Sequence, residues 1–145
     1  MDCCLIEHVT SSPQETEALG MSFARTLRPD SVIALCGPLG AGKTCLVKGI
    51  ALGLGITENI TSPTYTIINE YPGFLHGRPV TLYHIDAYRL SGDEDFAQTG
   101  AGECFAGGGI TVIEWSNRIP RSIPPGALNI TITITAADSR IFRMP

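Results

Sequence analysis

The sequence predicts a three-layer α/β fold, in which a central mixed sheet with antiparallel hairpins is flanked by helices. Three observations predict it. Apolar runs typical of buried strands alternate with segments of helical spacing, a glycine-rich loop follows the first such run, and two later pairs of strand-like runs have short connections. The chain has 145 residues, enough for one sizeable core, so we expect a single domain over residues 1–145.

The first predicted helix begins after Ser12 and runs to about Leu27. Ser12 is a favoured N-cap, Pro13 suits the first helical position, and Glu15 can reach back to complete a capping box. Because this helix precedes the first buried strand, we expect it to pack at the edge of the sheet, close to the loop that follows that strand.

An apolar run at residues 31–36 predicts a buried parallel strand. It leads into Gly37-Pro38-Leu39-Gly40-Ala41-Gly42-Lys43-Thr44, which matches the pattern G-x-x-x-x-G-K-[ST] at every fixed position. Apolar residues at helical spacing come next and predict a helix from Lys43 to the glycines at positions 53 and 55.

This stretch predicts a loop that binds phosphate groups. Gly37, Gly40 and Gly42 allow backbone N–H groups to converge on an anion. Lys43 is placed to reach the β- and γ-phosphates, and the Thr44 hydroxyl is placed to bind Mg²⁺ at the start of a helix. The first predicted helix, which begins after Ser12, would either contact the adenine base or serve only as scaffold. Two alternatives to a hydrolysing phosphate loop remain. The stretch is an ordinary glycine-rich turn, or it binds nucleotide without hydrolysing it.

A hydroxyl-rich segment at residues 61–65 follows this helix. It could be a switch that senses the γ-phosphate through Mg²⁺ or the attacking water, or it could be a turn, because Ser, Thr and Pro favour turns. Strand patterns at residues 66–71 and 80–86, with a turn at Pro72-Gly73, then predict an antiparallel hairpin.

Two predicted strands end in carboxylates, Asp86 after residues 80–85 and Glu114 after residues 110–113. In open α/β sheets, carboxylates at strand ends beside a phosphate loop hold Mg²⁺ or orient water. For Asp86, a turn or a helix cap is the alternative. Trp115 follows Glu114. It either packs in the core, or it reports closure of the site or meets a partner.

The rest of the chain predicts short helical turns and a second hairpin. Glycines weaken any long helix between residues 91 and 109, so short turns and loops are expected there. Strict alternation at residues 128–135 predicts a half-exposed strand that pairs with residues 139–144, as an antiparallel hairpin at a sheet edge.

Composition excludes several classes of protein. The net charge is −4 and no basic run occurs, so any connection with nucleic acid would come through a partner. The five cysteines show no C-x-x-C spacing, which favours reduced thiols over disulfides or a zinc site. No segment has the character of a secretion signal or a membrane span, so we expect a soluble cytoplasmic protein.

With these features in place, the sequence resembles the bacterial TsaE (YjeE) family, the ATPase of tRNA threonylcarbamoyladenosine synthesis. The resemblance runs through most of the chain. It is carried by GPLGAGKT at residues 37–44, SPTY at 62–65, HIDAYRL at 84–90, VIEW at 112–115, and Arg140 in the final hairpin. The first motif is generic to P-loop proteins, and the other four in this order make the resemblance specific.

The resemblance implies a single P-loop NTPase domain that binds ATP and Mg²⁺ and hydrolyses ATP slowly by itself. It also implies ATP-dependent work with the synthase subunits TsaB and TsaD, through which alone the protein would meet tRNA. By position, Lys43 and the loop would hold the triphosphate, and Thr44 with Glu114 would bind Mg²⁺.

Four further roles also come from the resemblance alone. Thr64 would belong to the switch, and Asp86 would take part in hydrolysis. Trp115 would couple the catalytic state to the partner, and Arg140 would contact the nucleotide.

Two other functions remain open. A small-molecule kinase would need cationic groups that close over the transferred phosphoryl group, whereas the arginines here are scattered. A nucleotide-gated binding module with little turnover would have no need of two strand-end carboxylates.

Overall fold

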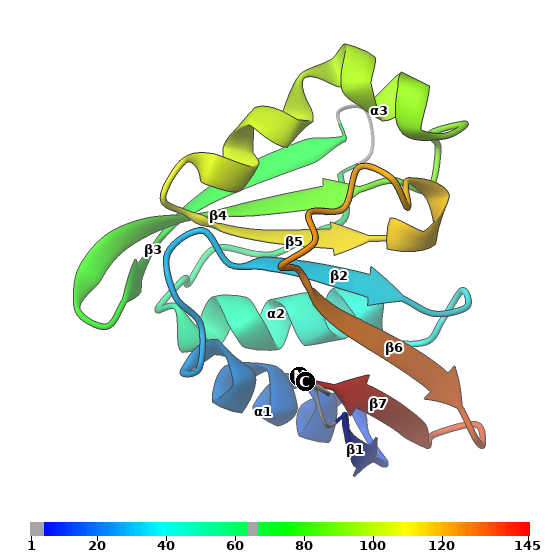
Figure 1. Ribbon diagram of the computed structural model, residues 1–145. Coiled ribbons are helices and arrows are strands. Elements are labelled where there is room, and N and C mark those ends of the chain that lie inside the picture. Colours follow the sequence, from blue (N-terminus) through cyan, green and yellow to red (C-terminus); the bar gives the residue numbers. More distant parts are fainter. Residues whose placement is uncertain (1–4, 64–66) are drawn as a thin grey trace.

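The computed structural model describes residues 5–63 and 67–145, in which one mixed sheet lies between helices (Figure 1). The strands are β1 (Ile6–Thr10), β2 (Val32–Cys36), β3 (Ile68–Leu75), β4 (Arg78–Asp86), β5 (Ile110–Glu114), β6 (Leu128–Ile134) and β7 (Arg140–Met144). The helices are α1 (Pro13–Ala24), α2 (Lys43–Gly53) and α3 (Asp93–Thr99), with 3-10 segments η1 (Ala101–Ala106) and η2 (Ser116–Arg118).

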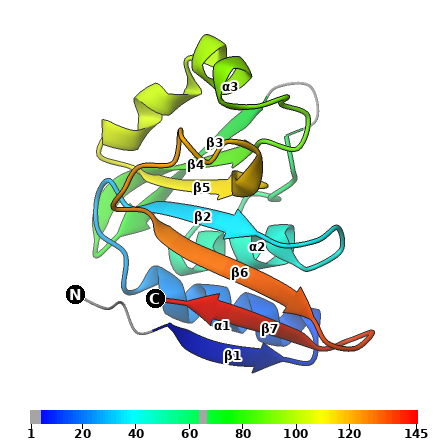
Figure 2. The ribbon, with the colours of Figure 1, turned by 45° about the vertical axis from the view of Figure 1, so that its right-hand side comes forward.

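The strand order is β1-β7-β6-β2-β5-β4-β3 (Figures 1 and 2). β2 lies between β6 and β5 and runs parallel to both, and β4 is parallel to β5. The hairpins β3–β4 and β6–β7 extend the sheet on either side. Because parallel strands end at the same edge of a sheet, the carboxyl ends of β2, β4 and β5 meet, and the candidate site lies there.

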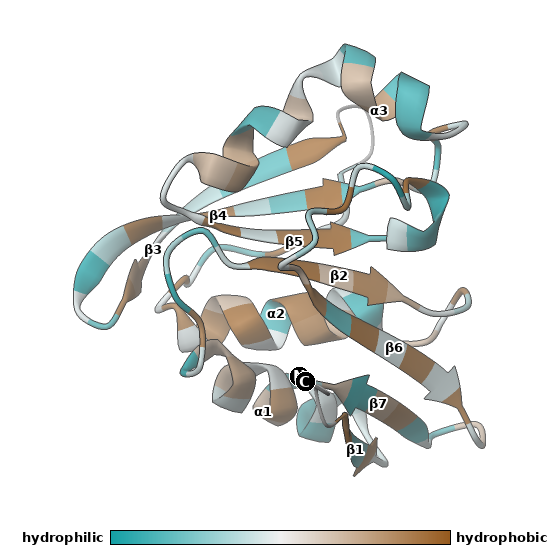
Figure 3. Ribbon diagram, viewed as in Figure 1, coloured by the Kyte–Doolittle hydropathy of each residue, from teal (hydrophilic) through white to brown (hydrophobic). Residues whose placement is uncertain are grey.

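The central strands contribute apolar side chains to a core on each face of the sheet, and β2 is apolar along most of its length (Figure 3). Ile33 and Leu35 of β2 belong to the core formed with α1 and α2. Val32 and Ile113 belong to the core formed with α3 and the 3-10 segments. Successive side chains of a strand point to opposite faces, which explains this division. The predicted three-layer α/β fold is confirmed.

Helices α1 and α2 lie with their backbones unusually close. A Cβ atom on Gly49 would lie 2.2 Å from the carbonyl oxygen of Glu17, and one on Gly20 would lie 2.6 Å from that of Leu46. Only glycine fits at these two positions, because a larger side chain would force the helices apart. This packing holds α2 in place, and α2 begins directly after the glycine-rich loop at residues 37–42.

Helix α2 has the predicted bounds, but α1 is shorter than predicted. α1 begins at Pro13 as expected, and Ser12 Oγ accepts a hydrogen bond from the backbone N–H of Glu15 at 3.1 Å. It ends at Ala24 rather than at about Leu27. The backbone N–H groups at positions 26 and 27 bond three residues back instead of four, so the chain tightens into a turn.

The first predicted hairpin forms, but its turn lies elsewhere. Pro72 and Gly73 do not turn the chain; they lie inside β3, where they pair with Thr81 and Val80. The turn is at His76-Gly77, whose φ angles of 51° and 79° suit a tight hairpin. β3 is an edge strand, and an edge tolerates a proline because one side of the strand needs no donor.

Strand β1 has no counterpart among the predicted elements, and it changes the place of the final hairpin. β1 pairs antiparallel with β7, so the β6–β7 hairpin does not form the edge of the sheet as expected. Ile6 and Val9 of β1 are 55% and 66% exposed, so the strand has no clear alternation of buried and exposed residues. In the described residues, no helix has both the length and the apolar character needed to cross a membrane.

Candidate active site

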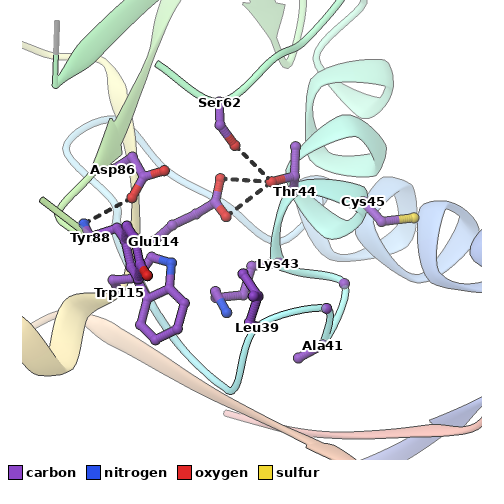
Figure 4. Close-up of a pocket in the computed structure, with 12 residues that line it drawn as sticks. Leu39, Ala41, Lys43, Thr44, Cys45, Ser62, Asp86, Tyr88, Glu114 and Trp115 are labelled. Carbon is purple, nitrogen blue, oxygen red and sulfur yellow. Dashed lines mark hydrogen bonds between the residues drawn. The ribbon is translucent and has the colours of Figure 1, made fainter. Parts of the chain in front are cut away.

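The carboxyl ends of β4 and β5 and the loop after β2 surround one cavity of about 380 Å³ (Figure 4). Asp86 ends β4 and Glu114 ends β5, and the two residues are register partners on neighbouring parallel strands. The loop between β2 and α2 lies beside them and forms the opposite wall. Both strand-end carboxylates therefore face the phosphate-loop motif, in a cavity large enough for a small ligand.

The loop backbone has the conformation for which its glycines are needed. Gly40 and Gly42 have φ angles of 78° and 97°, in the left-handed region that other residues rarely adopt. Gly42 directly precedes α2, and it has no side chain to cap the first turn. The N-terminal N–H groups of α2 are therefore free of a side-chain cap beside the cavity, as in sites that bind anions.

The ammonium group of Lys43 is held at the cavity wall. Its Nζ donates hydrogen bonds to the carbonyl oxygens of Gly37 at 2.6 Å and Pro38 at 2.8 Å, and it lies 4.0 Å from the ring centroid of Trp115. Burial lowers the pKa of Lys43, and the nearby Glu114 carboxylate opposes this shift. An anion that enters the cavity would meet a cation already in position.

The Thr44 hydroxyl links the loop to β5. Its Oγ1 lies 3.0 Å from Oε1 and 3.1 Å from Oε2 of Glu114, and 3.0 Å from Oγ of Ser62 (Figure 4). A hydroxyl carries a single proton, so Thr44 donates to the carboxylate and accepts from Ser62. Glu114 is only 3% exposed, and it depends on such donors.

A buried histidine supplies a second donor to the same carboxylate. His84 lies on β4 and is fully buried, with Nε2 2.5 Å from Oε2 of Glu114. The Glu114 carboxylate is therefore held from two sides, by the imidazole and by the Thr44 hydroxyl.

Asp86 is less enclosed than Glu114 and has a different environment. Its Oδ1 accepts a hydrogen bond from the backbone N–H of Tyr88 at 2.9 Å. Burial raises the pKa of Asp86; the Tyr88 N–H opposes this shift, and the Glu114 charge adds to it. A carboxylate whose pKa is raised is a stronger base than an ordinary aspartate, and it is suited to accept a proton from water.

Aromatic side chains form the rim of the cavity on the β5 side. The rings of Trp115 and Tyr88 have centroids 4.9 Å apart, and the guanidinium of Arg118 lies 5.2 Å from the Tyr88 ring. Trp115 has a φ angle of 58°, which is rare for a large side chain and typical of strained functional sites. The chain turns sharply at Trp115, directly after β5, and the indole lies against the Lys43 ammonium.

Arg140 lies beside the glycine-rich loop at residues 37–42. One nitrogen, Nη2, donates to the carbonyl oxygen of Gly40 at 3.1 Å, and the two hydrogens of Nη1 are shared among three carbonyl oxygens of the β6–β7 turn, each 3.1 Å away. The side chain thus ties this turn to the loop. It also lines a second cavity of about 180 Å³, whose other walls are the start of α1 and the loop.

Most of the predicted site residues lie around the first cavity. These are Leu39, Gly40, Ala41, Gly42, Lys43, Thr44, Asp86, Glu114 and Trp115. Gly37 and Pro38 contact the Lys43 ammonium through their carbonyls, and Arg140 lies at the second cavity. Thr64 lies outside the described residues.

Ser62, His84 and Tyr88 also belong to the site; Ser62 lies in the hydroxyl-rich segment proposed as a switch or a turn, and no individual role is predicted for any of the three. His84 precedes Asp86 by two residues in one strand, so both side chains face the same side of the sheet. The two-residue spacing from Asp86 could therefore have indicated that His84 lies at the site. Ser62 and Tyr88 lie in irregular segments, where no periodicity places a side chain.

The oxygen atoms around Thr44 fit a small divalent cation such as Mg²⁺. Mg²⁺ prefers oxygen ligands and is usually bound by one or two protein groups, with water and substrate phosphates in the other positions. Thr44 and Glu114 supply such oxygens at the cavity wall. Within residues 5–63 and 67–145, no group of three His, Cys, Asp or Glu side chains could hold a metal ion. Phosphates or waters would have to complete the coordination.

Comparison with known proteins places the chain in a family. The family model described as "Threonylcarbamoyl adenosine biosynthesis protein TsaE" matches residues 10–142. Two similar relatives are both described as "tRNA threonylcarbamoyladenosine biosynthesis protein TsaE". The Treponema pallidum protein is 48% identical over 132 residues, covering 91% of this chain and 94% of the relative. The Bacillus subtilis protein is 40% identical over 131 residues, covering 90% and 79%.

A solved structure agrees with this assignment. The crystal structure of Bacillus subtilis YdiB matches with a TM-score of 0.79 and 35% identity, over 97% of this chain and 84% of that one. The seven-stranded mixed sheet flanked by helices is consistent with a P-loop NTPase fold. The matched residues include the loop, both strand-end carboxylates and most of the final hairpin. The chain therefore belongs to the TsaE family.

Proposed function

We propose that this chain binds ATP with Mg²⁺ and hydrolyses it slowly, as a component of the machinery that makes threonylcarbamoyladenosine in tRNA. The names of the relatives support the pathway. The observation that carries the ATPase is that Lys43, Thr44, Asp86 and Glu114 line one cavity, although they come from three separate parts of the chain.

The loop and the second cavity provide for the nucleotide. The loop N–H groups, the start of α2 and the Lys43 ammonium would bind the phosphates. The second cavity opens on the other side of residues 40–42, next to the start of α1. It would accept part of the nucleoside, so α1 would contribute more than scaffold.

Thr44 and Glu114 would hold Mg²⁺, which when bound would neutralise charge on the phosphates. Asp86 is the residue that we assign to the attacking water. Its raised pKa and its place beside Glu114 suit a group that orients water and accepts its proton. The Trp115 indole lies over the Lys43 ammonium, so closure of the site would change the environment of the indole.

We further propose that the protein works in the cytoplasm through protein partners, TsaB and TsaD. The net charge of −4 favours contact with tRNA through those partners rather than directly. Two apolar side chains lie exposed at the mouth of the cavity, Leu39 at 78% and Tyr88 at 46%. Exposed apolar groups beside a binding site are typical of surfaces that proteins cover.

The test is ATP turnover by the chain alone and with TsaB, TsaD and tRNA. We expect slow turnover alone and stimulation by the complex. Lys43→Ala should weaken ATP binding by about 10- to 100-fold, because a charge-assisted hydrogen bond contributes about 1.5–3 kcal/mol. Normal binding and turnover in Lys43→Ala would refute the proposal.

The same assays separate the other two functions. Transfer of the γ-phosphate of labelled ATP to a small metabolite would identify a kinase. Phosphate release that is unchanged in Asp86→Ala and Glu114→Ala would favour a nucleotide-gated binding module.

A further inference from the structure

His84 is a buried polar residue whose presence the packing does not explain. Its side chain is fully buried, and its Nδ1 atom has no hydrogen-bond partner among the described residues. An unpaired polar atom in the interior costs free energy that an apolar side chain of similar size would avoid. The stability of the sheet therefore gives no reason for a histidine at this position.

The contact of the other ring nitrogen, Nε2, with Glu114 explains why a histidine stands at position 84. Nε2 lies 2.5 Å from Oε2 of Glu114, so the ring donates from Nε2 to the carboxylate, whereas Nδ1 has no partner among the described residues. His84 contacts the carboxylate from β4, whereas the Thr44 hydroxyl contacts it from α2. A glutamate has three rotatable bonds, and these two donors together determine where its oxygens point.

We propose, on the basis of the nucleotide and Mg²⁺ site described above, that His84 is a positioning residue for Glu114. Its Nε2–H holds one carboxylate oxygen, so the carboxylate stays beside the Thr44 hydroxyl, where the metal ligands are needed. The polar partners behind a metal ligand set ligand orientation and typically change metal affinity by about 10- to 100-fold. His84 therefore sets how strongly Mg²⁺ strengthens nucleotide binding, without contacting nucleotide or metal itself.

The experiment compares His84→Gln with His84→Asn in the full chain. The amide nitrogen of glutamine can take the place of Nε2, whereas the shorter asparagine places its amide near Nδ1 and cannot reach Glu114. Both variants bury an amide, so they are matched in polarity. Calorimetry with a non-hydrolysable ATP analogue gives the dissociation constant in EDTA and in Mg²⁺, and their ratio is the metal-dependent gain. Thermal unfolding without ligand shows that each variant is folded.

We expect His84→Asn to bind the analogue normally in EDTA but to lose about tenfold or more of the metal-dependent gain, and His84→Gln to retain most of it. Equal gains in the two variants would overturn the proposal and leave the proposed ATPase standing. An unchanged protein that fails to bind the analogue, or binds it without a metal-dependent gain, would overturn the nucleotide and Mg²⁺ site itself, and this inference with it.

Discussion

Replacement of Thr44 by valine tests the hydroxyl at the centre of the site. Valine keeps nearly the same shape and removes a single oxygen. That oxygen lies 3.0 and 3.1 Å from the two oxygens of Glu114, and 3.0 Å from Oγ of Ser62. The variant therefore removes one of the two side-chain donors that the described residues offer to a carboxylate that is 3% exposed.

The size of the effect follows from this environment. A hydrogen bond to a charged group contributes about 1.5–3 kcal/mol, but His84 still donates to the carboxylate and water can enter the adjoining cavity. We therefore expect the free energy of unfolding to fall by about 1–2 kcal/mol. For a chain of this length, 1 kcal/mol shifts Tm by about 2–4 °C, so Tm should fall by about 2–8 °C.

Two assays with a matched control decide the matter. Calorimetric unfolding without ligand gives the stability, and titration of a non-hydrolysable ATP analogue with and without Mg²⁺ gives the metal-dependent gain. Thr44→Ser keeps the hydroxyl and should retain most of both quantities, whereas Thr44→Val should lose both. A valine variant as stable as the serine variant, with an intact metal-dependent gain, would refute the role given to the hydroxyl.

Two further predictions concern the fold and the pH dependence. Gly49→Ala should lower the free energy of unfolding by about 1–3 kcal/mol, because the added Cβ would lie 2.2 Å from the carbonyl oxygen of Glu17. In the same denaturant titration Gly126→Ala, whose Cβ meets nothing within 4 Å, should be neutral or slightly stabilising, and equal losses in the two would contradict the close helix packing. The raised pKa of Asp86 means that this group supports the fold below its unfolded-state pKa and loses that contribution as pH rises through its folded-state pKa. Asp86→Asn should therefore gain stability relative to the unchanged chain as pH rises above about 4, and a difference that stays flat in urea unfolding from about pH 3 to 7 would show the inference wrong.

The local sequence was enough to predict the elements that form the site. Helix α2 has the predicted bounds because the loop glycines set its start, and Gly53 and Gly55 set its end. Strands β2 and β5 are short apolar runs buried on both faces, and such runs have few other places in a fold. Each of these signals lies within about ten neighbouring residues.

The predictions of secondary structure are wrong where pairing with a distant strand outweighs the local sequence preference. Pro72-Gly73 is a typical turn sequence, but pairing with β4 extends the strand through it to Leu75. Likewise, β1 has little pattern of its own and is a strand because β7 offers a free backbone edge. Such pairings depend on which strands become neighbours, which no local pattern records.

The sequence by itself determined the chemistry of this protein: a loop that can bind phosphates, a lysine and a hydroxyl at its end, and two acids that close strands. Only the tertiary structure decided that Asp86 and Glu114 face that loop, because the order of strands in a sheet follows from packing between segments far apart in the chain. It also decided which neighbours act on each acid. Glu114 is enclosed between Thr44 and His84, and Asp86 stays open to the cavity, so two similar side chains are suited to different tasks.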